Sequence, residues 1–267
     1  MKYMIGVDMG TTSTKAVLYD ENGKFIMKHN IGYDLHTPNV DVSEENPDEI
    51  FDAVLMTVKY IVRESGIAKE DIKFISLSAQ MHSLIAMNED NQRLTENITW
   101  ADNRANDYAD LIEKSYGGFE LYQRTGTPIH PMSPLSKIFW MRHEEPKIFK
   151  QTAMFADLKT YVLFQLYERF VIDYSLGSAT GMMNLEQLDW DNKALELLGI
   201  ERNQLPQLVP TTYVLTGMKK RYATLMGIDE QTPVIVGASD GVLSNLGVNS
   251  YQKGEVAVTI GTSGAIR

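Results

Sequence analysis

The order of β-rich and helical segments near the N-terminus is the feature that most limits how this chain can fold. Three β-rich runs come first, separated by short turns that contain glycine; they span residues 3–7, 15–19 and 25–28. Residues 46–66 follow, with apolar side chains at helical spacing and an acidic first turn. A further strand is expected over residues 72–78, with 83–87 as its hairpin partner. This βββαβ order predicts a mixed sheet flanked by helices.

The rest of the chain reads as helices and two more apolar strands. Helical spacing of apolar residues is found over 104–114, 134–142 and 158–167, and a Pro-rich stretch at 128–134 separates the first two. Apolar runs at 233–238 and 255–260 are typical of buried strands. The expected fold has a mixed five-stranded sheet flanked by helices. We therefore expect one large domain over residues 1–248 and the opening of a second over 249–267.

The composition indicates an ordinary globular protein with a small-molecule partner. The 267 residues are 43% hydrophobic and 22% charged, which is enough apolar surface to bury a core. A net charge of −10 argues against binding nucleic acid or an anionic membrane, because both need clustered Lys and Arg. The absence of cysteine excludes disulfides, thiolate zinc sites and a thiol nucleophile. No apolar run reaches the ~18 residues of a spanning helix and no signal peptide is recognisable, so we expect a cytoplasmic protein.

Two segments, one at each end of the chain, contain a strand that leads into a Gly-Thr turn. They are residues 7–13 (VDMGTTS) and 258–264 (VTIGTSG). Glycine allows close backbone approach, and hydroxyls with successive N–H groups suit phosphate oxygens, so the two turns could grip one polyphosphate. Each is also compatible with a plain hairpin turn. Asp8 favours the phosphate interpretation, because a carboxylate at the end of an apolar strand needs a partner such as nucleotide-bound Mg²⁺. The chain has no GxxxxGK[ST] sequence, so this is not a Walker A loop.

Six motifs spread over the chain resemble, in their order, those of the FGGY family of carbohydrate kinases. They are residues 8–15 (DMGTTSTK), 78–82 (SAQMH), 100–104 (WADNR), 173–175 (DYS) with 179–181 (ATG), 239–241 (SDG) and 261–264 (GTSG). The resemblance implies an α/β, actin-like and ribonuclease-H-like fold of two similar domains, with ATP between them and the sugar bound mainly by the first. It also implies that this chain ends before most of the second domain. We therefore expect the chain by itself to bind ATP poorly and to be close to inactive.

The resemblance implies ATP and Mg²⁺ as cofactors and names the residues that would hold them. Asp8 would bind Mg²⁺ directly or through water. The residues facing the phosphates would be Gly10, Thr11, Thr12 and Lys15 from the first turn and Gly261, Thr262, Ser263 and Gly264 from the second. Lys15 could equally be a solvated lysine on a strand.

Asp240 lies where the family keeps its general base. The resemblance therefore implies that Asp240 accepts the proton of the attacking sugar hydroxyl and that Gly241 lies beside the substrate. Phosphoryl transfer passes through a loose transition state, so positioning the hydroxyl matters more than the strength of the base. The alternative is that Asp240 only caps a helix that starts near Val242, and the two roles are compatible.

The resemblance places five further residues at the sugar: Gln80, Met81, His82, Trp100 and Asp102. The first three follow a strand directly, so they should project from its carboxyl end into the cleft where α/β sheets bind ligands. Each also has a plainer interpretation. His82 could be a satisfied core histidine, Trp100 a core aromatic, and Asp102 a partner for nearby Arg104. Asp173 either orients the site or caps a turn.

Two stretches bear on the identity of the sugar. Residues 80–82 resemble the branch of the family that phosphorylates xylulose, gluconate and similar substrates, and residues 125–135 (TGTPIHPMSPL) are most similar to gluconate kinases. We therefore expect transfer of the γ-phosphoryl group of ATP to D-gluconate, giving 6-phosphogluconate, with xylulose as the alternative. The gluconate carboxylate needs a cationic or N–H-rich partner, and the candidates are His82, His130 and Arg104.

Two interpretations from other classes stay open on the sequence alone. One is a non-catalytic sugar sensor on the same fold, and retention of both Asp8 and Asp240 argues against it. The other is a chaperone-like or filament-forming ATPase, which would need neither the Gln80–His82 triplet nor a base at Asp240. A homodimer is among the assemblies that the sequence allows.

Overall fold

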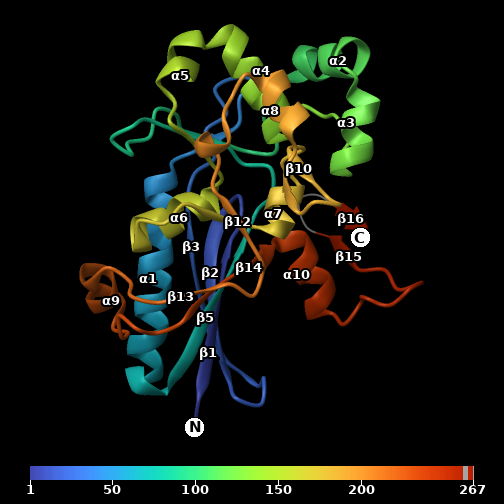
Figure 1. Cartoon of the computed structure of the whole chain (residues 1–267). Helices are drawn as coiled ribbons and strands as arrows, with labels where there is room; N and C mark the ends of the chain where they lie inside the picture. The colour runs from blue at the N-terminus through green and yellow to red at the C-terminus, as the bar shows by residue number, and fades with distance from the viewer. Residues whose placement is uncertain (261–263, 267) are drawn as a thin grey trace.

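A six-stranded mixed sheet forms the centre of the molecule in the computed structural model, which describes residues 1–260 and 264–266 (Figure 1). Its strands, in spatial order, are β13 (Val214–Leu215), β14 (Val234–Ser239), β5 (Ile72–Ala79), β1 (Tyr3–Met9), β2 (Ser13–Asp20) and β3 (Phe25–Gly32). β1 and β14 each run parallel to β5, while the other neighbours pair antiparallel. The runs predicted over 3–7, 15–19, 25–28, 72–78 and 233–238 all form strands of this sheet. The sixth, β13, has only two residues and leaves no sequence pattern.

The segment predicted as the hairpin partner of β5 pairs with a different strand. β6 (Ile85–Met87) runs antiparallel to β8 (Met154–Ala156), and all three of its residues are buried. Both edges of β5 are already occupied, one by β1 and the other by β14. Because a strand has only two hydrogen-bonding edges, β6 must find its partner outside the main sheet. The prediction over 83–87 was right about the strand and wrong about its partner.

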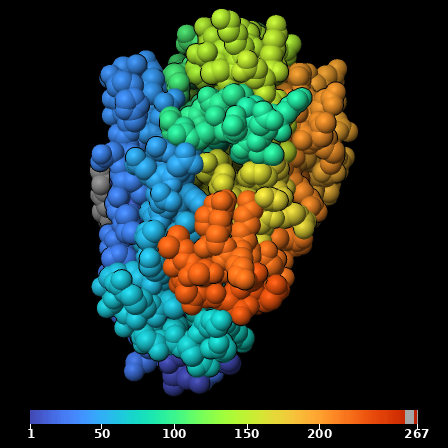
Figure 2. All heavy atoms as spheres, turned by 90° about the vertical axis from the view of Figure 1, so that its left-hand side faces the viewer, coloured from blue at the N-terminus to red at the C-terminus, as the bar shows by residue number. Residues whose placement is uncertain are grey.

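Helix α1 (Pro47–Ser65) covers one face of the sheet. Asn46 accepts a hydrogen bond from the Asp48 backbone N–H at its start, and Gly66 takes a left-handed conformation at its end (φ 66°). Its buried side chains recur at helical spacing and pack against β1, β2 and β3. α9 (Lys220–Met226) packs on α1 in turn, as Figure 2 shows. The helix predicted over 46–66 is confirmed with both of its caps.

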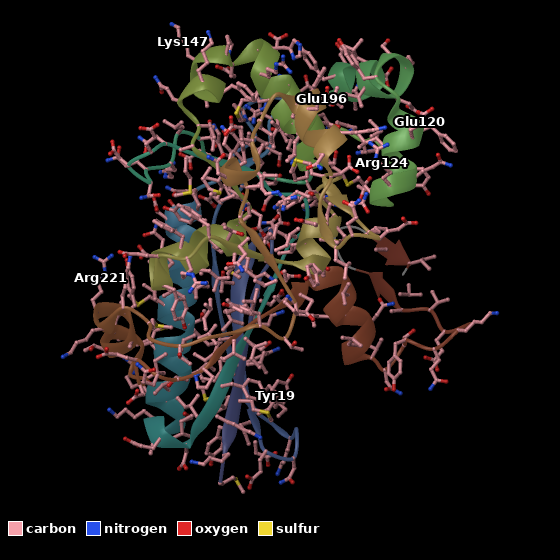
Figure 3. The ribbon with its side chains drawn as sticks, in the orientation of Figure 1. Tyr19, Glu120, Arg124, Lys147, Glu196 and Arg221 are labelled. Atoms are coloured by element: carbon pink, nitrogen blue, oxygen red, sulfur yellow. The ribbon has the colours of Figure 1, made fainter. Side chains whose placement is uncertain are left out.

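Most of the remaining helices gather beyond the carboxyl ends of the parallel strands, at the top of Figure 1. They are α2 (Asn106–Ser115), α3 (Gly118–Thr125), α4 (Pro134–Glu144), α5 (Pro146–Gln151) and α8 (Asn192–Leu198). Arg124 of α3, labelled in Figure 3, forms a 2.8 Å ion pair with Asp191, the residue that caps α8. α6 (Leu158–Tyr167) and α7 (Tyr174–Ser178) lie between this group and the sheet (Figure 1). α2, α4 and α6 correspond to the three helices predicted for this region.

Short ladders and single turns complete the fold. The ladders pair β4 (Glu44–Glu45) with β7 (Asn97–Ile98), β9 (Val171–Asp173) with β12 (Gln207–Val209), β10 (Met183–Asn184) with β11 (Asp189–Trp190), and β15 (Val258–Ile260) with β16 (Gly264–Ile266). Single 3-10 turns occupy Lys69–Asp71 and Arg202–Gln204. The strand predicted over 255–260 is shorter than expected, and β16 pairs with one of its edges. Within the described residues, no helix is both long and apolar enough to cross a bilayer.

A β-bulge near the end of β14 sets the direction in which the chain leaves the sheet. The register between β14 and β5 shifts between Ile235 and Ala238. Gly237 lies in this bulge with φ +72°, and a Cβ atom there would come within 1.8 Å of the Leu77 carbonyl oxygen. Only glycine fits this position, because both the left-handed backbone and the contact exclude a side chain. The bulge therefore sets the direction of the chain at Ser239, the N-cap of α10 (Asp240–Gly247), and at Asp240, its first residue.

Replacing Gly237 by Ala should destabilise the protein by more than about 3 kcal/mol, because the β14–β5 pairing must open to admit the methyl group. Urea unfolding measures the loss. Gly6→Ala is the matched control, since Gly6 lies in the same sheet and an added Cβ there meets no atom within 4 Å. Equal free energies of unfolding for Gly237→Ala and wild type would contradict this role of the bulge.

Candidate functional site

Three parallel strands bring the predicted site residues to one edge of the sheet. Asp8 on β1 is in register with Ser78 on β5, and Ser78 is in register with Ala238 on β14. Neighbouring strands lie about 4.8 Å apart, so the Asp8 and Ala238 backbones are about 10 Å apart across this row. Asp240 follows two residues after Ala238, and residues 80–82 follow the central strand directly. The carboxylates at 8 and 240 and the histidine at 82 therefore lie at the same edge.

Asp8 and Lys15 line a hollow on the face of the sheet opposite α1. The Ser78 hydroxyl donates a 2.7 Å hydrogen bond to Asp8 Oδ1. Lys15 is exposed and stands opposite Asp8 in the β1–β2 pairing. The hollow has a volume of about 200 Å³, and Leu243 of α10 contributes to its wall. One half-buried carboxylate and one exposed ammonium group thus share an open surface.

The Gly-Thr turn between β1 and β2 is held from beneath by a half-buried tyrosine, Tyr33. Gly10 N–H donates to the Ser13 carbonyl at 3.1 Å, which closes the turn. The Tyr33 hydroxyl donates to the Gly10 carbonyl at 2.5 Å, and the Tyr33 N–H donates to the Thr12 carbonyl. Burial raises the pKa of Tyr33 well above its ordinary value, so this hydroxyl stays protonated and remains a donor. The turn keeps its shape without a ligand.

Gln80 lies beneath the surface rather than on it, in contrast to the expectation that it would project toward a sugar. Its side chain is 2% exposed, its amide donates to Glu45 Oε2 at 2.7 Å, and its Oε1 accepts from the Thr11 hydroxyl at 3.3 Å. The Thr11 hydroxyl in turn accepts a 3.0 Å hydrogen bond from the Trp100 indole. Gln80 and Thr11 therefore connect the Gly-Thr turn to Trp100.

Glu45 is a member of this network that sequence reasoning missed. It is 1% exposed and accepts hydrogen bonds from Gln80 and from Asn97 Nδ2, the latter at 2.8 Å. Burial raises the pKa of Glu45 to about 7, against the hydrogen bonds from Asn97 and Gln80, which lower it. In the sequence Glu45 resembles one more acidic residue before a helix, and nothing links it to Gln80, which lies 35 positions away.

His82 is held in one orientation and one tautomer. Its backbone has a φ of 65°, in the left-handed region, and its Nδ1 lies 2.9 Å from the Ala179 carbonyl oxygen. Burial and the charge of Lys137 lower the pKa of His82 to about 4, so the ring is neutral near pH 7. Nδ1 must then carry the proton that it donates to Ala179. Nε2 is left as an acceptor, which suits a hydroxyl donor.

Trp100 is available to a ligand, whereas Asp102 is not. The Trp100 side chain is 42% exposed, while Asp102 is 1% exposed. Asp102 accepts from the Ser43 N–H at 3.0 Å and pairs with Arg104 at 2.8 Å. Arg104 also pairs with Glu44 at 2.5 Å and is therefore held by two carboxylates. Asp102 was expected at the substrate, but the pairing with Arg104 that the sequence allowed is the arrangement found.

Asp240 is the first residue of α10, and its neighbour Ser239 is the capping residue. The Ser239 hydroxyl accepts from the Val242 N–H, and the Ser239 N–H donates to the Ser175 hydroxyl at 2.9 Å. The half-buried Asp240 carboxylate accepts a 2.7 Å hydrogen bond from the Gly241 N–H. The helix therefore starts two residues earlier than expected, and Asp240 is not its N-cap. Asp173 caps α7 and forms a buried 2.6 Å ion pair with Lys159, so the capping interpretation of that residue is confirmed.

Met81 and Gly241 share a second hollow, next to Asp240. Its volume is about 350 Å³, and its wall includes Ser239, Val242 and Leu246 of the β14–α10 segment. The predicted nucleotide-binding residues Gly261, Thr262 and Ser263 lie outside the described residues, and Gly264 begins β16. Among the residues described, no group of three or more His, Asp or Glu side chains could hold a metal ion. A metal at this edge would therefore be held by fewer than three side chains of these types from the described residues.

Residues 3–247 match the family model for the N-terminal domain of the FGGY family of carbohydrate kinases. The chain is 53% identical over 265 residues to a gluconokinase of Bacillus subtilis (strain 168), a match that covers 99% of this chain and 51% of the relative. It is 30% identical over 266 residues to a xylulose kinase of the same strain, covering 100% of this chain and 53% of that relative. The chain thus spans about half the length of the curated relatives it matches.

Solved structures give a similar picture of the fold. A gluconate kinase from Lactobacillus acidophilus superposes with a TM-score of 0.95 at 40% identity, over 99% of this chain and 53% of that one. A structure titled as ligand-bound xylulose kinase from the same organism also gives a TM-score of 0.95 at 40% identity, over 100% of this chain and 54% of that one. The arrangement of sheet and helices described above is therefore that of the sugar kinase fold.

Glu45→Gln should change how stability depends on pH. Between the ordinary pKa of 4.5 and the folded pKa of about 7, the folded state binds more protons than the unfolded state. The stability that Glu45 contributes is therefore complete below about pH 4.5 and is lost as the pH rises through about 7, by up to about 3 kcal/mol. Gln cannot ionise and keeps an acceptor oxygen for Gln80 and Asn97.

The measurement is urea unfolding of both proteins at pH 5 and pH 8. The variant should gain stability relative to wild type at the higher pH. A difference between the two proteins that is the same at both pH values would contradict an ionisable, buried Glu45.

Proposed function

The chain belongs to the FGGY family of carbohydrate kinases, and we propose that the whole protein transfers the γ-phosphoryl group of ATP to D-gluconate, giving 6-phosphogluconate. The observation that carries the proposal is the meeting of Asp8, His82 and Asp240 at one edge of the sheet in a chain of this family. The proposal concerns the whole protein, because this chain spans only about half the length of its curated relatives.

Sequence similarity supports gluconate over xylulose. Identity to the Bacillus subtilis gluconokinase is 53%, against 30% to the xylulose kinase of the same strain. Xylulose is the second candidate, because the Lactobacillus acidophilus structures titled xylulose kinase and gluconate kinase are both 40% identical to the chain. The two sugars differ in charge, so the deciding feature would be a group that recognises the gluconate carboxylate.

Of the three candidates for this group, we propose His130, whose side chain is exposed. Arg104 is already engaged by Asp102 and Glu44, and His82 is neutral near pH 7. His130 is exposed, and its Nδ1 accepts a 3.2 Å hydrogen bond from the Met132 N–H. Its proton then resides on Nε2, which can donate to a carboxylate oxygen.

Asp240 is proposed as the general base. Its carboxylate lies at the carboxyl end of β14, beside the hollow lined by Met81 and Gly241. A sugar in this hollow could place a hydroxyl within reach of the carboxylate, while His82 Nε2 accepts from another hydroxyl. Because the transition state of phosphoryl transfer is loose, the main contributions of these residues are to orient the nucleophile and to receive its proton.

The phosphates of ATP are proposed to meet the Gly10–Thr12 turn and Lys15. The backbone N–H groups and hydroxyls of such a turn suit phosphate oxygens, and Lys15 adds a positive charge on the same open face. Gly261, Thr262, Ser263 and Gly264 are proposed to meet the nucleotide from the other side. A cytoplasmic location is part of the same proposal, because the reaction consumes ATP. A homodimer stays a prediction from the sequence.

Asp8 is proposed as the Mg²⁺ ligand. Mg²⁺ in kinase sites is usually held by one or two carboxylates together with waters and substrate phosphates, so a single carboxylate fits this ion. Ser78 fixes one oxygen of Asp8 and thereby orients the group toward the hollow that Lys15 lines. When bound, Mg²⁺ would neutralise charge on the phosphates.

An ADP-release assay of the whole gene product, run against gluconate, xylulose, ribulose, glycerol and fuculose, tests the reaction. We expect gluconate to give the highest kcat/KM. A higher kcat/KM for glycerol or fuculose would contradict the assignment. ADP release that is equally fast without any sugar would favour an ATPase of another class.

Asp240→Asn should lower kcat by about 10²-fold or more, because the amide cannot accept the hydroxyl proton. Its affinity for gluconate should stay within about threefold of wild type, since Asn keeps the size and one acceptor oxygen. Steady-state kinetics and equilibrium titration with gluconate measure the two effects. Asp110→Asn changes an exposed carboxylate of α2, away from the site, and should leave both unchanged. An Asp240→Asn protein with wild-type kcat would remove Asp240 as the base.

A further inference from the structure

Lys137 of α4 is a buried lysine bonded to backbone carbonyl groups. Its side chain is 1% exposed. Its Nζ atom lies 2.6 Å from the His82 carbonyl oxygen, 2.6 Å from that of Thr99 and 3.3 Å from that of Ile98. An ammonium group has three N–H donors and no acceptor, so three carbonyl groups use its full capacity. The lysine thus joins α4 to two loops that are distant in the sequence.

Burying this amino group costs desolvation free energy, which only the hydrogen bonds it makes can offset. Burial lowers the pKa of Lys137 to about 7; the nearby Asp102 carboxylate opposes this shift and the Arg104 guanidinium adds to it. A methionine of similar length could fill the same space without a desolvation cost, as buried polar groups are often replaceable by apolar ones. What methionine cannot do is hold three carbonyl oxygens from two loops.

The carbonyl groups that Lys137 holds belong to the loops that carry the sugar-facing side chains. His82 is fixed at both ends, since its carbonyl is bound by Lys137 and its ring by the Ala179 carbonyl. The hydrogen bond from Lys137 to the His82 carbonyl helps to hold the His82 backbone in the left-handed region, which non-glycine residues seldom adopt. Thr99 is bound by Lys137 directly before Trp100, and the Trp100 indole is fixed by the Thr11 hydroxyl. Lys137 thus fixes the backbone at His82 and at Thr99, and these two backbone segments orient the imidazole of His82 and the indole of Trp100.

We propose that Lys137 is a positioning residue for the sugar: it holds the His82 and Thr99 carbonyl groups so that His82 and Trp100 form a sugar subsite before the sugar arrives. The inference rests on the proposed kinase function. Lys137 does not touch the substrate, because its side chain is buried and its donors are used. Losing it would leave the loops free to move, so the sugar would have to order them on binding.

The test is Lys137→Met in the whole gene product, with kcat and KM measured separately for gluconate and for ATP. We expect the KM for gluconate to rise at least tenfold, with kcat and the KM for ATP within about threefold of wild type. Lys147→Met is the matched control, because Lys147 is exposed on α5 at the periphery of the molecule (Figure 3) and the substitution makes the same change of side chain. It should leave all constants unchanged.

A second readout measures sugar binding without turnover. Trp100 is far more exposed than the other two tryptophans, Trp140 at 8% and Trp190 at 3%. Gluconate should change the fluorescence of wild type, and Trp100→Phe identifies the part of the signal that comes from Trp100. In Lys137→Met the same change should need at least tenfold more gluconate. Unchanged gluconate affinity in a folded Lys137→Met protein would overturn the inference, as would equal losses for gluconate and ATP.

If Lys137→Met does not fold, by circular dichroism and thermal unfolding, Lys137→Gln takes its place. Its amide keeps two N–H donors, so we expect an intermediate rise in the KM for gluconate. A wild-type KM in this variant would also overturn the inference. Wild type is assayed in parallel: a wild type that phosphorylates no sugar refutes the proposed function, whereas an active wild type with an equally active Lys137→Met refutes only the role of Lys137.

Discussion

The parallel pairing of β1, β5 and β14 is the constraint on which the rest of the structure depends. Parallel strands end at the same edge of a sheet, so three segments separated by long stretches of chain deliver their following residues to one place. Asp8, the triplet at 80–82 and Asp240 reach this edge for that reason alone. The bulge at Gly237 then decides how Asp240 leaves the sheet, because the chain there passes directly over the Leu77 carbonyl group.

Beneath this edge, buried polar groups orient the exposed ones. Glu45 and Gln80 fix Thr11, and Thr11 fixes the Trp100 indole. Lys137 fixes the backbone of the two neighbouring loops at the His82 and Thr99 carbonyl groups. Isolated buried polar groups are costly, but a connected set restricts the conformations that the loops above it can adopt. This arrangement explains how a site assembled largely from loops can be ordered without a ligand.

The same burial also sets the charges that a substrate would meet. His82 is neutral, Arg104 is matched by two carboxylates, and Lys137 is covered, so three of the basic groups near the edge present little positive charge to the outside. Such a surface suits a neutral sugar, since a neutral imidazole accepts a hydrogen bond from a hydroxyl group and an exposed indole face packs against C–H groups. Recognition of an acidic sugar at this surface would rest on a small number of exposed donors, which makes each of them a determinant of specificity.

The sequence by itself determined the long strands of the sheet, the helices α1, α2, α4 and α6, and the edge at which the candidate site lies. Asn46 and Gly66 marked the ends of α1, the alternating runs marked the five long strands, and the Gly-Thr motif after β1 marked a tight turn that is a candidate phosphate loop, because these signals are local. Only the tertiary structure decided which partners buried residues choose. The pairing of β6 with β8, and the hydrogen bonds of Gln80 with Glu45 and of Lys137 with His82, join positions 35 or more residues apart. Such contacts depend on which edges and donors the folded chain has left unused, and no local pattern records that.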